Sequence, residues 1–110
     1  MPAGDFAALT ARLLGRDPLH IEAHGRPIEF LAWCTGAGQG YISEAADLGV
    51  DGFLSGEISE QTTHQARELG LDYVAAGHHA TERYGVHALG QHLAERFGIE
   101  HLFLDLDNPA

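Results

Sequence analysis

The chain has 110 residues, enough for one domain with one hydrophobic core. Sixteen acidic residues against six basic ones give a formal charge of −10, which argues against binding to nucleic acid or to an anionic membrane surface. No apolar run approaches the roughly 20 residues of a membrane span, the first residues lack the regions of a signal peptide, and the single cysteine cannot form an internal disulfide. A cytoplasmic protein is therefore expected.

The period of the apolar residues switches between that of helices and that of strands along the chain. The first predicted helix has Asp5 as its N-cap and Gly15 as its stop, and the last is the longest. In chain order, the pattern predicts a helix over 5–14, a strand over 19–21, a mostly buried strand over 28–34, a helix over 41–48, a strand over 52–55, a helix over 60–69, a strand over 73–76, a helix over 81–97 and a strand over 101–106.

Alternating strands and helices with short connections predict an α/β fold over residues 1–110, in which helices flank a layered, mainly parallel sheet. Ligands of such sheets collect beyond the carboxyl ends of the strands. Three loops that each follow a predicted strand and contain glycine are expected to meet at that edge, namely Thr35–Gly38, Ser55–Glu57 and Gly77–His79.

The most informative segment is Gly77–Glu82, which follows the apolar run 73–76. His78 and Glu82 are four residues apart, so on a first helical turn both side chains can point the same way. An imidazole and a carboxylate in that arrangement can share one divalent metal ion. A solvated pair on a helix has the same spacing and is the ordinary interpretation; the position at a strand end, directly after a glycine, makes the metal site an equally good one.

Three further side chains are candidates for roles at this edge. Glu57 is expected to face the same cleft as His78, where it would orient a ligand or act as a general base on a bound water. Capping of the next helix by Glu57 or Ser59 is an equally good interpretation. His79 is expected to point away from its neighbour and to pack or to support a ligand. For His64, on a predicted helix, a surface or half-buried position is favoured.

The glycine-rich segment Gly36–Gly40 resembles a phosphate-binding loop only superficially. It lacks the Lys-Ser/Thr pair of a P-loop and the full spacing of the dinucleotide fingerprint. A tight turn between strand and helix is the favoured interpretation, and backbone N–H groups offered to an anion are a second one. Cys34, just before this turn, is interpreted as a core residue.

Specific motifs lie at Ala32–Gln39, Ser55–Gln61, Ala76–Arg83 and Asp105–Ala110. The block His-His-Ala-Thr-Glu and the ending Asn-Pro-Ala are the most distinctive of them. Together they resemble the NIF-three-like family, known in bacteria as GTP cyclohydrolase I type 2 homologues or dinuclear-metal-centre hexameric proteins. The resemblance runs from about Pro18 to the end of the sequence.

The resemblance implies a paired divalent-metal site, holding zinc, iron or manganese, inside a ring-shaped homohexamer. Two of the family's metal ligands fall on His78 and Glu82. The others, two adjacent histidines and an aspartate, belong to an upstream half that nothing in this sequence matches. Because family members are roughly twice as long, a homo-oligomer or a partner chain is expected to supply the missing half.

Two functions are therefore expected. The first is a metal-dependent hydrolase resembling GTP cyclohydrolase I type 2, which acts on a small molecule such as a nucleotide and has Glu57 as its candidate catalytic residue. The second is a non-catalytic metal-binding or scaffold module that assembles into a ring. Two protein ligands are fewer than the three that a catalytic zinc site keeps, so this chain alone is expected to be a poor catalyst.

Overall fold

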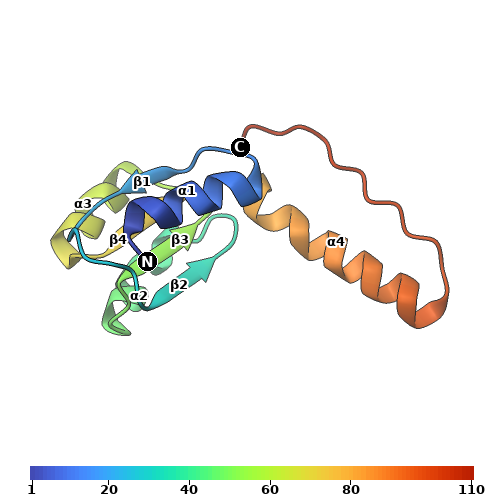
Figure 1. Ribbon diagram of the computed structural model, residues 1–110, viewed down its shortest axis with the longest axis horizontal. Helices are drawn as coiled ribbons and strands as arrows, with labels where there is room; N and C mark the ends of the chain where they lie inside the picture. Colours follow the sequence, from blue (N-terminus) through green and yellow to red (C-terminus); the bar gives the residue numbers. More distant parts are fainter.

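The computed structural model describes residues 1–110, and Figure 1 shows a sheet with helices around it and one long helix that projects away from it. The α/β fold predicted from the sequence is confirmed. The elements are α1 (Ala3–Leu14), β1 (Leu19–Ile21), β2 (Leu31–Cys34), the 3-10 helix η1 (Gln39–Tyr41), α2 (Ile42–Asp47), β3 (Gly52–Ser55), α3 (Glu60–Leu69), β4 (Asp72–Ala75) and α4 (His78–Phe97).

The four strands lie in the order β1-β4-β3-β2, with β2, β3 and β4 parallel and β1 antiparallel to β4. Helices α2 and α3 form the crossover connections that parallel strands need. Cys34 pairs with Ser55, and Ser55 pairs with Ala75, so the three parallel strands end at the same level. The loops that follow them therefore meet at one edge of the sheet, as the sequence predicts.

Helices cover both faces of the sheet. Phe53 and Tyr73 point toward α2 and α3, and their rings meet edge to face with centroids 5.7 Å apart. Because side chains alternate along a strand, Leu54 points the other way, where it lines an apolar slot under α1. The main core consists of Ile21, Ile42, Ala45, Val50, Phe53, Ala66, Leu71, Tyr73 and Ala75.

The predicted strand over 28–34 is shorter and less buried than expected. The carboxylate of Asp51 accepts hydrogen bonds from the backbone N–H groups of Glu29 and Phe30, which holds this stretch outside the strand ladder. Pairing begins only at Leu31. Because β2 is an edge strand, Trp33 is 70% exposed, so the expectation of a mostly buried strand is wrong.

Two helix starts also differ from prediction. Helix α1 begins at Ala3 after Pro2, so Asp5 lies in the first turn and is not the N-cap. Helix α4 begins at His78, earlier than the predicted start at 81, because Gly77 adopts a φ of +100° and turns the chain directly from β4 into the helix. A φ in this range favours glycine, since a Cβ would be strained there.

The predicted strand over 101–106 does not form. After α4 the chain runs back along that helix without pairing to the sheet (Figure 1). The alternation that suggested a strand instead serves contacts with the helix: Phe103 stacks on His87 at 4.6 Å between ring centroids, and Asp105 pairs with Arg83 at 3.1 Å. No helix of the structure is both long enough and apolar enough to cross a bilayer.

Candidate metal centre

His78 and Glu82 project from the start of α4 toward the same side. The Nε2 atom of His78 lies 3.1 Å from Oε2 of Glu82. The two side chains are 38% and 52% exposed, so a metal ion can reach them from solvent. The pairing predicted from the four-residue spacing is therefore present, and its two atoms are of the types that bind zinc and related divalent ions.

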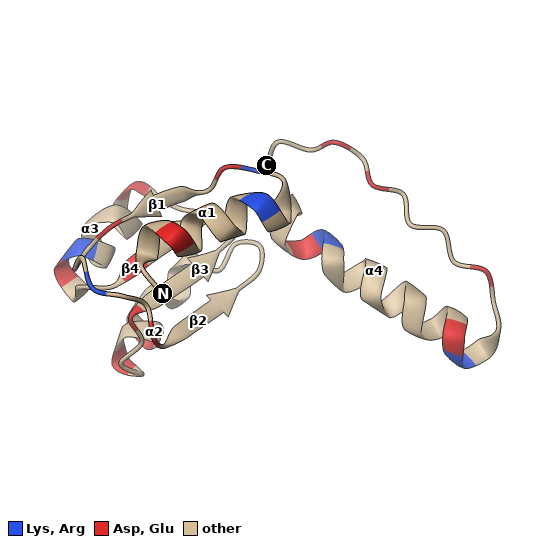
Figure 2. Cartoon of the chain, viewed as in Figure 1, with Lys and Arg blue, Asp and Glu red and all other residues tan.

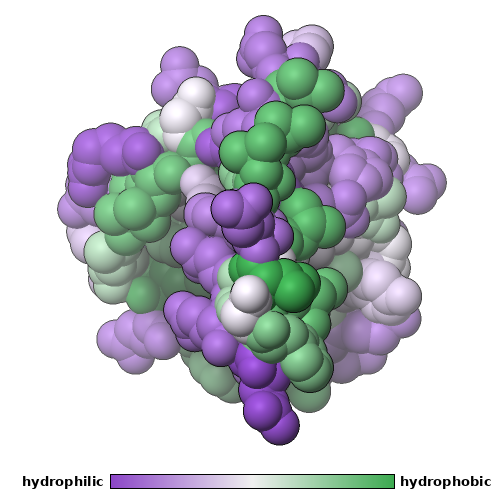
Figure 3. Space-filling view, turned by 90° about the vertical axis from the view of Figure 1, so that its right-hand side faces the viewer, coloured by the Kyte–Doolittle hydropathy of each residue, from purple (hydrophilic) through white to green (hydrophobic).

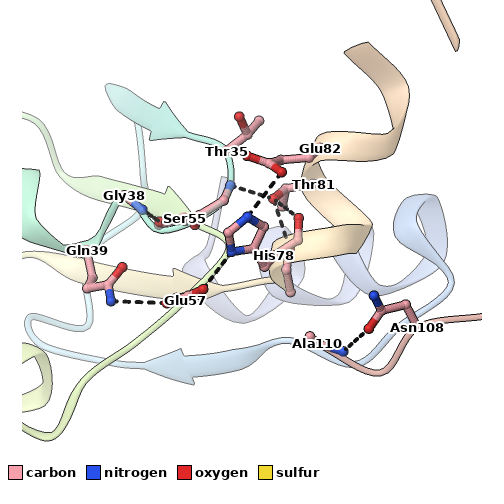
Figure 4. Close-up of polar contacts among 12 residues, drawn as sticks. Thr35, Gly38, Gln39, Ser55, Glu57, His78, Thr81, Glu82, Asn108 and Ala110 are labelled. Atoms are coloured by element: carbon pink, nitrogen blue, oxygen red, sulfur yellow. Dashed lines mark hydrogen bonds and ion pairs between the residues drawn. The ribbon is translucent and has the colours of Figure 1, made fainter. Parts of the chain in front are cut away.

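The loop after β3 brings Glu57 to the other nitrogen of the same imidazole (Figure 4). Its Oε1 lies 2.6 Å from Nδ1 of His78, which confirms that the two residues share one cleft. Gln39 donates from Nε2 to Oε2 of Glu57 at 3.3 Å and also lies 3.4 Å from Oγ of Ser59. With both carboxylate oxygens of Glu57 engaged, the imidazole ring is held in one orientation.

The electrostatics of this pair are reciprocal. The hydrogen bond with Glu57 raises the pKa of His78, and the same bond lowers the pKa of Glu57. A carboxylate at Nδ1 fixes the orientation of the ring, and the other nitrogen, Nε2, faces the carboxylate of Glu82. The arrangement has the form of a carboxylate–histidine pair that supports a metal ligand.

Two buried hydroxyl groups hold the edge loop Thr35–Gly38 in place, and sequence reasoning missed both of them. Oγ1 of Thr81 accepts a hydrogen bond from the N–H of Gly36 at 3.0 Å. Oγ of Ser55 donates to the carbonyl of Gly36 at 3.2 Å and accepts from the N–H of Gly38 at 3.0 Å. The N–H groups of Gly36 and Gly38 therefore have partners inside the protein, as expected for the tight-turn interpretation of the glycine run.

The glycines of these loops allow a close approach to α4. Gly36 has a φ of +64°, and a Cβ there would collide with Oε1 of Glu82 and lie 3.1 Å from Nε2 of His78. A Cβ on Gly56 would lie 2.8 Å from Cα of His78. Only residues without a side chain permit this packing, so the sheet edge fixes where the candidate ligands stand.

The remaining candidates lie outside this cluster. His79 lines the same groove as His78, but its Nε2 pairs with the returning tail, 3.6 Å from Oδ1 of Asp105. His64 is exposed on α3, where it lines a shallow surface with Ser59 and does not reach the cluster. Cys34 is half-buried and packs against the edge of the core. No group of three or more His, Cys, Asp or Glu side chains surrounds a potential metal position.

Two grooves give access to His78. One, of about 390 Å³, runs along α4 past Glu82 to Val86. The other, of about 460 Å³, lies on the Glu57 side and includes Arg16. Lys and Arg positions are few and scattered along the chain (Figure 2), and each groove is lined by one arginine, Arg83 in the first and Arg16 in the second.

Comparisons with known proteins agree with this architecture. The chain is 59% identical over 110 residues to a GTP cyclohydrolase 1 type 2 homolog of Pseudomonas aeruginosa, and 63% identical over 110 residues to one of Allochromatium vinosum. Each of these matches covers 100% of this chain and 43% of the relative. A solved structure of protein ybgI, of unknown function, superposes with a TM-score of 0.96 at 48% identity, over 100% of this chain and 45% of the other.

The chain thus spans less than half the length of the relatives that it matches. The family match covers residues 1–109 and extends to the first helix, beyond the resemblance seen from about Pro18 onward. The sequence matches and the superposition cover the whole chain, and so include the edge loops and the segment that carries His78 and Glu82. The chain belongs to the Duf34/NIF3 (NGG1p interacting factor 3) family.

Proposed function

We propose that this protein binds a divalent metal ion through His78 and Glu82 and contributes to a metal-dependent hydrolase that acts on a nucleotide, as the relatives' name, GTP cyclohydrolase 1 type 2 homolog, suggests. The observation that carries the proposal is the placement of one imidazole between two carboxylates. Glu57 holds Nδ1 at 2.6 Å, and Glu82 lies 3.1 Å from Nε2.

The residues present fit one side of such a site. Nε2 of His78 and the carboxylate of Glu82 supply the nitrogen and oxygen donors that zinc, iron and manganese accept. A bound divalent ion supplies Lewis acidity that activates water or polarises a substrate oxygen. The chain's own residues provide orientation: Glu57 sets the ring, and Gly36 sets the position of Glu82.

Glu57 remains the candidate catalytic residue, and two roles are open to it. A general base needs a carboxylate oxygen turned toward the reacting water. Here one oxygen is bonded to His78 and the other faces the amide of Gln39. This geometry favours the orienting role, in which Glu57 acts through the imidazole rather than on the substrate.

A non-catalytic metal-binding or scaffold module that assembles into a ring is the second candidate function. The observation that favours it is the apolar surface of α4, where Val86, Leu89 and Phe97 are all more than half exposed. Contiguous exposed apolar side chains mark sites of association. Two ligands from one chain also leave a metal ion mostly in its own water shell, so further ligands would come from a second copy or a partner chain.

The metal assignment is tested by replacing His78 and Glu82 singly with alanine and measuring bound metal by elemental analysis after dialysis against zinc, manganese or iron. We expect either change to abolish retention. The matched control is His92→Ala, because His92 lies exposed on the same helix without a polar partner. Wild-type stoichiometry in both His78→Ala and Glu82→Ala would show that the metal, if bound, sits elsewhere.

A separate assay tests the hydrolase proposal. GTP ring opening and phosphoester hydrolysis are measured with each metal, for this chain and for a version extended with the additional half that its relatives have. We expect turnover in the extended protein and little in this chain. Equal metal-dependent turnover in both would mean that these 110 residues hold all the necessary groups, whereas metal-bound assembly without turnover in either would favour the scaffold.

The role of Glu57 is tested by Glu57→Gln, which keeps the shape but weakens the bond to Nδ1. Loss of such an outer partner costs about 10- to 100-fold in metal affinity. We expect a decrease in that range in a zinc titration, with Glu60→Gln on exposed α3 as the control. Unchanged affinity together with lost turnover in the extended protein would instead support a general base.

A further inference from the structure

Helix α4 begins without the side-chain cap that usually satisfies the free N–H groups of a first turn. Its N-cap residue is Gly77, which has no side chain to offer. The backbone N–H of His79 instead donates to the main-chain oxygen O of Ala110 at 3.1 Å. A main-chain oxygen of the returning tail therefore occupies the place of a capping side chain at the helix that carries the candidate metal ligands.

Two residues shape the tail for this contact. Nη1 of Arg16 donates to the carbonyl of Pro109 at 2.6 Å, and the same side chain lies against Gly77, where a Cβ would be 2.6 Å from Nη1. Oδ1 of Asn108 accepts from the N–H of Ala110 at 3.0 Å, which closes a tight turn. Figure 4 shows Asn108 and Ala110 beside the first turn of α4.

We propose that the tail segment 108–110 caps α4 and that Arg16 holds the tail in place. Arg16 is then a positioning residue: it lines the groove on the Glu57 side and acts on His78 through the tail, by fixing the turn on which His78 stands. Ala110 also lines both grooves that lead to His78, so the tail forms part of their walls. The capping follows from the contacts alone, whereas the consequence for metal binding rests on the proposed function.

The test compares Arg16→Ala with Arg12→Ala, a matched control, because Arg12 is exposed in the last turn of α1, four residues before Arg16, and has no hydrogen-bond partner. Amide hydrogen exchange is followed by mass spectrometry in a peptide that covers the first turn of α4. Loss of a helix cap, worth about 1 kcal/mol, corresponds to about fivefold faster exchange. We expect this rise in Arg16→Ala and not in Arg12→Ala, while exchange in α3 and β4 stays unchanged in both.

Two conservative variants distinguish loss of the hydrogen bonds made by Arg16 and Asn108 from loss of side-chain volume. Arg16→Lys keeps a donor that can reach Pro109 and should recover most of the protection. Asn108→Asp keeps the acceptor for the N–H of Ala110 and should behave like the wild type, whereas Asn108→Ala should match Arg16→Ala. Cobalt affinity, measured by titration of the visible absorption, should fall about fivefold in the two variants that lose protection.

Each outcome decides a different part of the proposal. Unchanged exchange at the first turn in Arg16→Ala would overturn the capping role. Faster exchange with unchanged cobalt affinity would overturn the positioning role. A wild-type protein that binds no metal would contradict the proposed function, and the positioning role with it, while the exchange rates still decide whether the tail caps α4.

Discussion

The chain consists of two regions that differ in how they are stabilised. All 24 buried residues lie between Ala3 and Thr81, and not one residue after Thr81 is buried. The body, residues 3–81, has a sheet covered by helices on both faces. In the outer region, residues 82–110, most of α4 and the tail contact only each other. Figure 3, which faces the outer end of α4, shows hydrophobic side chains at the surface there.

The candidate metal centre lies at the boundary between these regions. Glu57 and the glycine loops belong to the body. The two candidate ligands, His78 and Glu82, stand at the beginning of α4, where that helix leaves the body. Local stability follows burial, so the ligand-bearing turn combines a rigid support on one side with an accessible surface on the other. This difference between the regions leads to three predictions.

The largest effect on stability is expected when a buried leucine of the body is compared with an exposed leucine of α4. Leu71 is 1% exposed in the core, and Leu89 is 57% exposed on α4. Truncation of a buried leucine to alanine costs about 2–5 kcal/mol, because apolar contacts are lost and a cavity remains. We expect Leu71→Ala to lower the free energy of unfolding in urea by that amount, and Leu89→Ala by less than about 0.5 kcal/mol.

The same pair of variants can break the comparison. If Leu89→Ala destabilises as much as Leu71→Ala, the outer surface of α4 is buried in solution by another chain. The loss would then depend on protein concentration, which sedimentation measured in parallel would show. Equal losses without such dependence would mean that α4 packs more closely on its own chain than the structure indicates.

The second prediction tests how tightly the glycine loop of the body fixes the positions of the candidate metal ligands. Gly36→Ala places a methyl group against Glu82 and His78, whereas Gly49→Ala meets no atom within 4 Å. Both glycines have positive φ, +64° and +71°, so the backbone strain of the substitution is shared. We expect similar stability losses of about 1 kcal/mol, but about tenfold weaker metal binding only in Gly36→Ala, because the added methyl group separates the ligands.

Equal metal affinities in these two variants would show that the carboxylate of Glu82 moves aside without consequence. The ligand pair would then be independent of the glycine loop, and the close approach seen in the structure would be only a packing feature. A loss in Gly49→Ala as large as that in Gly36→Ala would assign the effect to backbone strain and global stability.

Sequence reasoning recovered the body better than the outer region for a physical reason. The strands over 19–21 and 52–55 were located correctly: Ile21 and Phe53 pack in the core, and short apolar runs of this kind mark strands locally. The tail over 101–106 has the same alternation, but it meets a helix and not a strand, and periodicity alone does not identify the partner. The short strand at 31–34 likewise depends on Asp51, whose bonds to a loop distant in sequence leave no local signal.

In the candidate site, too, local features could be predicted from the sequence and contacts between distant segments mostly could not. The spacing of His78 and Glu82 is local, and the contact with Glu57 follows from parallel strands that end at one level. Thr81 and Ser55 were missed, because a hydroxyl on a helix or at a strand end has many ordinary roles and its partner is visible only in three dimensions. The contact of the tail with α4 was missed for the same reason.

The smallest effect concerns a hydrogen bond that joins the core to the site. The buried hydroxyl of Tyr73 donates to the carbonyl of Glu57 at 2.6 Å, and burial raises the pKa of Tyr73 from 10.0 to about 12. Because the folded pKa lies above the ordinary value, the fold favours the protonated phenol. The resulting stability is fully present below pH 10 and is lost as the pH rises toward about 12.

Replacing this tyrosine by phenylalanine tests that statement within the comparison of the two regions. We expect Tyr73→Phe to cost about 1 kcal/mol at neutral pH, because the carbonyl of Glu57 loses its donor. We also expect the wild type to lose stability in urea above pH 10, and Tyr73→Phe to lack that decline. The matched variant is Tyr84→Phe on α4, whose hydroxyl donates to the carbonyl of Leu13 at 3.0 Å in an exposed position. Water replaces that donor readily, so its cost should stay within about 0.5 kcal/mol. Equal costs at both positions would mean that α4 is held to the body as firmly as the core strands are held to one another, and the difference between the two regions would then be one of exposure and not of stability.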